Sequence, residues 1–312
     1  MKIIYALLLF FIVFSAQAQQ LPLFSQYREY GGVINPGSIP YDYFFNEKKL
    51  SFGASYRKQW VTAQDGPSTQ MIRADYVSDK GRVAPILGAY ILNDKAGRLG
   101  MTGMYLRAAM LISDNPLDYG FAAGLNVGLV RYTLDLKNAH VQDINALAIY
   151  DNRSTLFPDV GLGVYGYTTF NNEHKIYGGL SMPQALSLDT RFRNEDQTLS
   201  IRRVRHFYGT AGYKIPLSQS GFLEGNLWVR YITPLKPSFD FNVRWQIEGN
   251  SGPVMYVGTG MSTNGNAHLE TGCLIGDEKI LRIGVGADLP FTAFSSFYGT
   301  SLEFNIGYAI GQ

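Results

Sequence analysis

The sequence predicts an all-β protein, a transmembrane antiparallel β-barrel of fourteen strands preceded by an irregular N-terminal segment. Three observations predict it. Apolar and polar residues alternate along many stretches of about ten residues, as in membrane strands. The connections between these stretches are sorted by length along the chain. Beyond the first twenty of the 312 residues, no apolar run reaches the about 20 residues that a membrane-spanning helix needs.

The first residues have the pattern of a signal peptide. Lys2 supplies a positive start, the apolar run 3–14 follows, and Ala16-Gln17-Ala18 is a small-x-small cleavage pattern. The run is too short for an uncleaved anchor, since spanning takes about 20 residues. We therefore expect residues 1–18 to be a cleaved signal peptide and the mature chain to be exported to the outer membrane.

The net charge and the cysteine content exclude several classes of function. The formal net charge is only +2, which argues against a nucleic-acid partner. The single cysteine, Cys273, allows no internal disulfide and no thiolate metal cluster. No histidine is spaced with another as a metal pair, so we expect neither a metal nor a cofactor.

Residues 19–49 differ from the rest of the chain. They contain three prolines and no sustained alternation, but they are rich in tyrosine and phenylalanine. Disordered tails are poor in aromatic residues. We therefore expect an irregular segment that lies in the barrel lumen or under the barrel, rather than a floppy tail.

Alternation identifies the strands of the barrel, which we place within residues 50–312. In FDFNVRWQIE, 239–248, the apolar residues share one parity and the charged or amide residues share the other. One such strand fits a soluble sandwich as well as a barrel. The predicted strands are 50–60, 68–78, 83–93, 98–112, 118–134, 158–170, 174–182, 203–215, 221–232, 238–248, 253–263, 267–275, 280–289 and 298–310. Residues 83–93 and 98–112 alternate poorly.

The connections decide between the two folds. An even-stranded outer-membrane barrel keeps both termini in the periplasm, so its even connections are tight periplasmic turns and its odd connections can be long. Here the even connections are short and turn-like, and the two long ones, 135–157 and 183–202, are both odd. A soluble sandwich has no reason for this sorting. In such a barrel we expect the stretch SYRKQW, 55–60, to have Tyr56 and Trp60 facing lipid and Arg57 and Gln59 facing the lumen.

Catalysis has weak support. His268 and Glu270 share the lumen parity and could form an acid–base pair, but any barrel strand supplies such pairs as polar lining. No G-x-S-x-G turn is present. We therefore expect no enzyme activity.

A basic cluster lies at the second long connection. It could bind lipopolysaccharide phosphates or an acidic partner surface, or it could pair with Asp189, Glu195 and Asp196 of the same loop. The cluster consists of Arg191, Arg193, Arg202, Arg203 and Arg205.

Two stretches together resemble the PorP/SprF family of type IX secretion proteins. The stretch 21–38 resembles the family's mature start, and 51–70 resembles its Tyr-Arg-x-Gln-Trp and Gly-Pro-x-Thr elements. The chain departs from the family at Gly37-Ser38, and it ends on Gln312, whereas many barrels end on an aromatic residue. The matching residues are Phe24, Ser25, Gln26, Tyr27, Asn35, Pro36, Tyr56, Arg57, Gln59, Trp60, Gly66, Pro67 and Thr69.

The resemblance implies a part of the type IX secretion and gliding apparatus. Its expected partners are the C-terminal domain of a large secreted surface protein, periplasmic type IX components, and outer-membrane lipid and lipopolysaccharide. The alternative that the residues leave open is a passive or fatty-acid-type transport barrel.

Overall fold

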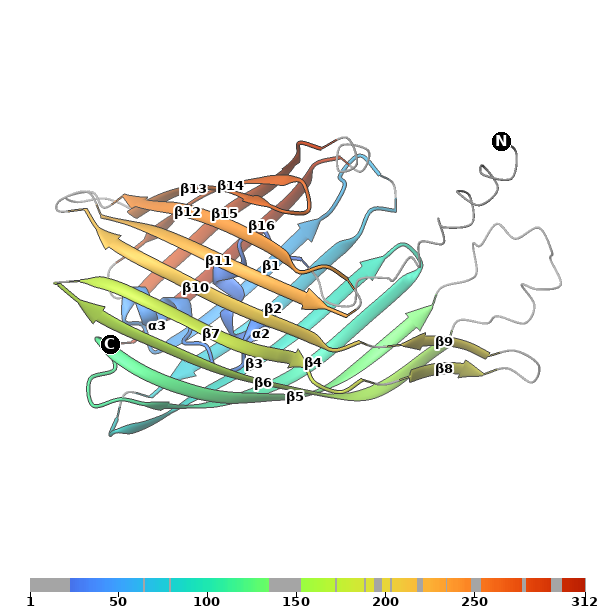
Figure 1. The fold of residues 1–312 in the computed structure, drawn as a ribbon, viewed down its shortest axis with the longest axis horizontal. Helices are drawn as coiled ribbons and strands as arrows, with labels where there is room; N and C mark the ends of the chain where they lie inside the picture. The colour runs from blue at the N-terminus through green and yellow to red at the C-terminus, as the bar shows by residue number, and fades with distance from the viewer. Residues whose placement is uncertain are drawn as a thin grey trace, which may run out of the picture.

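The structure is a computed structural model of the chain. It describes residues 23–311 except for 64, 79, 135–152, 172, 188, 194–197, 203, 218–220, 234, 248–253, 277–278 and 293–298. Fourteen antiparallel strands form a closed barrel, and two further strands form a separate two-stranded sheet (Figure 1). The predicted fourteen-stranded barrel is confirmed.

The barrel strands follow one another around the wall in chain order, and β1 pairs with both β2 and β16 to close it. The barrel strands are β1 (Leu50–Lys58), β2 (Ser68–Val77), β3 (Val83–Ala96), β4 (Leu99–Ile112), β5 (Tyr119–Leu134), β6 (Arg153–Phe170), β7 (His174–Gln184), β10 (His206–Pro216), β11 (Phe222–Ile232), β12 (Ser238–Ile247), β13 (Val254–Ser262), β14 (Asn266–Ile275), β15 (Lys279–Pro290) and β16 (Ser301–Ile310).

The two ends of the barrel differ in their connections. We call one the long-loop end; its connections are 59–67, 97–98, 135–152, 185–205, 233–237, 263–265 and 291–300. We call the other the short-turn end; its connections are 78–82, 113–118, 171–173, 217–221, 248–253 and 276–278. Both connections that were predicted to be long lie at the same end.

The long connections differ in detail from the prediction. β6 begins at Arg153, so the first spans 135–152 instead of 135–157. The second spans 185–205 and contains the two-stranded sheet of β8 (Asp189–Arg193) and β9 (Thr198–Arg202). In Figure 1 this sheet extends beyond the barrel at the long-loop end.

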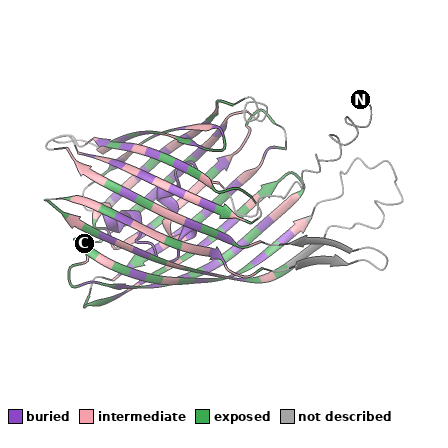
Figure 2. Ribbon diagram, in the orientation of Figure 1, coloured by how far each residue is buried: buried purple, intermediate pink, exposed green. Residues whose placement is uncertain are grey.

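Side chains alternate between a buried and an exposed side along the wall (Figure 2). In β12, Phe241 is 50% exposed, whereas the neighbouring Asn242 is 1% exposed. The exposed side is rich in large apolar residues on every part of the barrel, as expected for a surface that faces lipid. The predicted inward and outward parities of β12 are confirmed.

The prediction for β1 is partly wrong. Tyr56 faces outward, 43% exposed, and Arg57 faces inward, 4% exposed, as expected. The strand ends at Lys58, however, so Gln59 and Trp60 lie in the following connection rather than on the strand. Trp60 has a left-handed backbone, φ 51°, and is half-buried, because the chain turns there toward β2.

β3 and β4 also alternate between the two sides, although their sequence hid it. Leu106 of β4 is 70% exposed and the inward Leu111 is fully buried, so both sides of the strand are apolar. Inward Leu111 and Ile86 pack in one cluster with Phe44 of the N-terminal segment. The inward side of these strands is partly apolar, which weakens the contrast that alternation depends on.

Residues 23–49 lie inside the barrel and are called the plug below. The plug contains the short helices η1 (Tyr27–Tyr30), α2 (Gly31–Ile34) and α3 (Tyr41–Asn46), most of whose residues are buried. Figure 1 shows α2 and α3 within the ring of strands. No helix in the described part of the chain is long and apolar enough to cross a membrane.

The plug runs through the barrel from one end to the other. Its first residues contact the ends of β1 and β16 at the long-loop end, and Lys49 joins β1 at the short-turn end. The described start of the chain thus lies at the long-loop end, whereas β1 begins and β16 ends at the short-turn end.

The outer wall is hollowed over β1–β6, beside β16. The hollow has a volume of about 960 Å³ and is lined mainly by outward apolar side chains such as Ile72, Met104 and Leu106. These side chains lie on the outward side of the wall, which is the side that faces hydrocarbon in an outer-membrane barrel.

Candidate functional site

The two sequence motifs meet inside the barrel, at its long-loop end. The Arg57 guanidinium on β1 donates a hydrogen bond to Ser25 Oγ at 2.9 Å and another to Asp288 Oδ2 at 2.6 Å. Glu303 on β16 accepts the backbone N–H of Ser25 at 2.7 Å and the hydroxyl of Tyr30 at 2.9 Å. Three wall strands thus hold the start of the plug.

The other residues of the first motif have separate partners on the wall. Gln26 Oε1 accepts hydrogen bonds from Asn305 Nδ2 at 2.6 Å and from Tyr256 Oη at 3.2 Å. The ring of Tyr27 packs on Trp228, with centroids 5.2 Å apart. Phe24 instead stacks on Tyr30 within the plug, at 4.3 Å.

Buried ion pairs cross the centre of the lumen. Arg28 lies 3.2 Å from Glu224 and 3.0 Å from Glu270, which are on different wall strands. Glu29, the next residue, lies 3.0 Å from Arg244 and 2.8 Å from Arg282. Arg28 of the plug therefore pairs with carboxylates of the wall, and the neighbouring Glu29 pairs with arginines of the wall.

The network extends to α3 of the plug. Asp42 lies 2.6 Å from Arg282 and 3.6 Å from Arg73. Arg244 also reaches Glu270, at 2.9 Å. A buried charge is tolerated only when it is paired, and every member of this network has an opposite charge beside it.

The Asn35-Pro36 element of the first motif rests on glycines of the wall. Asn35 Nδ2 donates to the backbone carbonyl of Val164 on β6 at 2.9 Å. A Cβ on Gly163 would lie 2.0 Å from Asn35 Oδ1, and one on Gly124 would lie 2.2 Å from the Pro36 carbonyl oxygen. The plug turn approaches the wall so closely that only glycine fits there.

The rest of the second motif shapes the connection 59–67. The Gln59 N–H donates to the Pro67 carbonyl at 2.8 Å, and Lys58 Nζ donates to the Gly66 carbonyl at 2.6 Å. A Cβ on Gly66 would lie 2.4 Å from the Gln59 carbonyl oxygen, so glycine is required. Thr69, the second residue of the return strand β2, donates to Asp94 at 2.6 Å.

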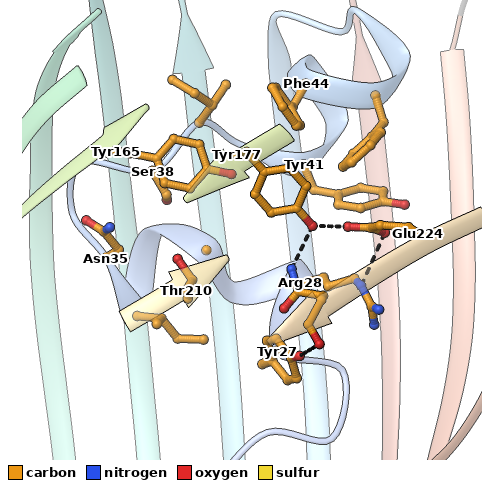
Figure 3. A pocket seen from close by; sticks show the side chains of 15 residues that line it. Tyr27, Arg28, Asn35, Ser38, Tyr41, Phe44, Tyr165, Tyr177, Thr210 and Glu224 are labelled. Atoms are coloured by element: carbon orange, nitrogen blue, oxygen red, sulfur yellow. Dashed lines mark hydrogen bonds and ion pairs between the residues drawn. The ribbon is translucent and has the colours of Figure 1, made fainter. Parts of the chain in front are cut away.

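A small cavity of about 50 Å³ lies between the plug and the wall (Figure 3). Tyr27, Arg28 and Tyr41 of the plug face Tyr177 and Glu224 of the wall there. The volume suits a few buried water molecules rather than an organic ligand.

His268 and Glu270 do not contact each other as an acid–base pair. His268 Nδ1 lies 2.5 Å from Asp288 and Nε2 lies 3.2 Å from Asp240, while Glu270 contacts arginines. Both residues line the filled lumen. Among the described residues, no group of three or more His, Cys, Asp or Glu is arranged to hold a metal ion.

The basic cluster lies mostly outside what the structure describes. Arg191 and Arg193 belong to β8 and Arg202 to β9, whose side chains are not described, and Arg203 lies outside the described residues. Arg205 is exposed just before β10. The backbone register pairs Asp189 with Arg202.

Sequence reasoning missed the charged partners of the plug. Glu29, Arg244, Arg282 and Glu303 were not predicted as a site, although they carry most of the contacts described above. One signal was present: charged residues recur on the inward parity of the strands, and an aromatic segment without strand pattern carries Arg28, Glu29 and Asp42.

Several solved structures have a similar fold. CymD, a monoaromatic hydrocarbon channel, superimposes with a TM-score of 0.59 at 9% identity over 91% of this chain and 93% of its own. The Pseudomonas putida toluene transporter TodX gives 0.55 at 7% identity, over 94% and 98%. A Pseudomonas aeruginosa FadL homologue gives 0.53 at 6% identity, over 85% and 90%.

At such low identity these likenesses show the fold alone. No curated protein sequence matches the chain. The model of one family, the type IX secretion system membrane protein PorP/SprF, matches residues 16–308. This range includes both motifs, the plug that carries the first of them and nearly the whole barrel, and the chain therefore belongs to the PorP/SprF family of type IX secretion system membrane proteins.

Proposed function

We propose that this protein is an outer-membrane barrel that anchors a large secreted surface protein or assists its export by the type IX secretion and gliding apparatus. It binds the C-terminal domain of that protein or periplasmic type IX components, and it reaches the outer membrane through a cleaved signal peptide, residues 1–18. Its role is non-catalytic and needs no cofactor. Family membership supports the secretion role.

The filled lumen is the observation that favours a scaffold over a transport barrel. The plug is bonded to strands on opposite sides of the wall, for example to Glu303 on β16 and to the Val164 carbonyl on β6. Removing one partner of a buried ion pair costs about 3–5 kcal/mol. Passage of a solute through the lumen would require several such pairs to break together.

The long-loop end is the proposed outer face, because extracellular loops of such barrels are longer than periplasmic turns. It carries the basic segment that we propose as the contact for an acidic partner surface or for lipopolysaccharide phosphates. That contact consists of Arg191, Arg193, Arg202, Arg203 and Arg205. The short-turn end then faces the periplasmic components.

Cysteine labelling tests this orientation. Single cysteines at Asn145 and Glu195, both outside the described residues, are introduced into a Cys273→Ser background. We expect both to react with an impermeant maleimide on intact cells. Labelling that requires permeabilised outer membranes would reverse the proposed orientation.

Pull-down from gently solubilised native membranes tests the function. We expect a large secreted surface protein or periplasmic type IX components to co-purify. Reversing the charge of Arg191 and Arg193 should reduce co-purification of the surface protein at least several-fold. The matched control reverses Lys80 and Arg82, which lie at the short-turn end.

Three results together would favour the transport alternative over the anchor. The protein would purify alone, it would conduct robustly in planar bilayers, and a deletion strain would show no secretion or adhesion defect.

A further inference from the structure

The outward side of the wall carries a polar row beside the hollow, toward the long-loop end of β1–β5. Strand pairing places Asn93 between Gln70 and Thr102, and all three residues are exposed. Asn93 Nδ2 donates to Gln70 Oε1 at 3.4 Å, and Thr102 Oγ1 donates to Asn93 Oδ1 at 2.9 Å. The row begins at Tyr56 on β1 and ends at Arg131 on β5, and both are exposed. A side of the wall that is otherwise rich in apolar residues therefore presents donors, acceptors and a charge here.

This polar patch is basic and has clear borders. One register row closer to the long-loop end, Lys58 and Lys95 lie on the same side of β1 and β3. With Arg131 on β5 they place a cation on every second strand, and such strands are about 10 Å apart. None of the described outward residues of these two rows of β1–β5 is acidic. In the row of Arg131, Phe304 on β16 and Leu156 on β6 are exposed and apolar, so the patch is limited to β1–β5.

The patch lies where the apolar band of the wall ends. On β3 the outward residues are apolar from Val83 to Ile91, and Asn93 is the next outward residue. From Val83 to Ile91 the strand rises about 27 Å, which covers about 20 Å of membrane depth at the usual strand tilt. The apolar band of outer-membrane barrels is about 25 Å tall. Asn93 and its row therefore lie at the boundary between hydrocarbon and lipid headgroups.

The hollow begins directly below the patch. Ile72, Ile91 and Met104 line it, and each lies two residues from a member of the patch on the same strand. Its floor includes the outward alanines Ala74 and Ala89, which are paired across β2 and β3. Its volume of about 960 Å³ is near the upper end of the range of small-molecule sites, about 300–1,000 Å³. The hollow thus has room for more than one hydrocarbon chain.

We infer that the polar patch and the hollow together form a binding site for one lipid A molecule, the phosphorylated and acylated disaccharide of lipopolysaccharide. The cations bind its phosphates, because ammonium and guanidinium groups make strong charge-assisted hydrogen bonds to phosphate. The amide and hydroxyl groups of the patch bind the sugars, and the hollow takes acyl chains. A lipid with a single phosphate would reach only one of the widely spaced cations.

This inference rests on the proposed function, which assigns the long-loop end to the cell surface and so places the patch in the outer leaflet. It adds a lipid site on the barrel wall, apart from the arginines of the connection 185–205.

Native mass spectrometry of the purified protein in neutral detergent tests the inference. The protein is titrated with diphosphorylated, hexa-acylated lipid A and, in parallel, with cardiolipin. The charge variant combines Lys95→Gln with Arg131→Gln, and its control combines Lys80→Gln with Arg82→Gln at the short-turn end. Heat-modifiable gel mobility shows that each variant folds.

A second pair of variants tests the hollow. Ala89→Phe fills its floor with an apolar ring that is compatible with the lipid face. Ala108→Phe is the matched control, because Ala108 is exposed on the outward side of β4 but does not line the hollow.

We expect the charge variant to bind lipid A about tenfold or more weakly than the unchanged protein, and Ala89→Phe to bind it several-fold more weakly. Both controls should stay within about twofold of the unchanged protein, which should bind cardiolipin about tenfold more weakly than lipid A. The inference is overturned if either variant binds lipid A like its control, or if cardiolipin binds as tightly as lipid A. Because the assay uses purified protein, its result does not depend on orientation. Reversed cysteine labelling on cells would refute the proposed orientation and leave the binding result standing.

Discussion

Replacing Glu29 by alanine should loosen the plug without opening the barrel wall. The carboxylate is almost fully buried and lies 3.0 Å from Arg244 and 2.8 Å from Arg282. Removing one partner of a buried pair costs about 3–5 kcal/mol. Each arginine keeps a second carboxylate, Glu270 or Asp42, so we expect the lower end of that range, about 3 kcal/mol. This corresponds to an about 100-fold larger population with the plug undocked.

Hydrogen exchange read by mass spectrometry measures this population. Amides of η1 and α2 should exchange about 100-fold faster in Glu29→Ala, while those of β12 should change little. The control is Asp114→Ala, which removes an exposed ion pair with Arg82 at 3.2 Å and should cost less than about 1 kcal/mol. Equal exchange in the two variants would refute the claim that the ion-pair network holds the plug.

Three further predictions concern the wall, the plug turn and the lumen. Val243→Arg places a charge on the lipid face of β12 and should impair assembly by about 2–4 kcal/mol, whereas Val243→Leu should assemble normally in a heat-modifiability assay. Gly163→Ala should lower the free energy of unfolding, measured in urea, by about 1–3 kcal/mol, because the added Cβ would lie 2.0 Å from Asn35 Oδ1. The control Gly166→Ala should not, because its Cβ would lie 3.8 Å from the nearest atom. Deleting residues 21–45 should produce conductance in planar bilayers that the intact protein lacks, and a silent deletion would mean that other parts of the chain close the lumen.

For strands that line the charged part of the lumen, the sequence predicts which side chains face inward and which face outward. In β12 the outward side is aromatic and aliphatic and the inward side carries Asp240, Asn242, Arg244 and Gln246, so a period of two is plain in the sequence. The same contrast is lost in β4. There the inward Tyr105 and Leu111 pack on other apolar groups, and both sides of the strand therefore look alike.

The path of the plug could not be predicted from its residues. Its helices have at most six residues and no strong period, and its position depends on charges that are far away in the sequence, such as Glu303 for Ser25. The Trp60 prediction failed for a related reason. Alternation continues to residue 60 in the sequence, but the turn bonded between Gln59 and Pro67 ends the strand at Lys58.

The filled lumen determines which positions of the barrel tolerate substitution and which do not. In an empty channel, an inward residue faces water and tolerates replacement. Here an inward residue such as Asn242 is packed like the interior of a soluble enzyme, so a substitution there disturbs neighbours on several strands. Freedom to diversify is left to the rim of the barrel and, among apolar residues, to its outward side. Proteins built on this plan should therefore differ mainly in the loops above a shared, nearly invariant interior.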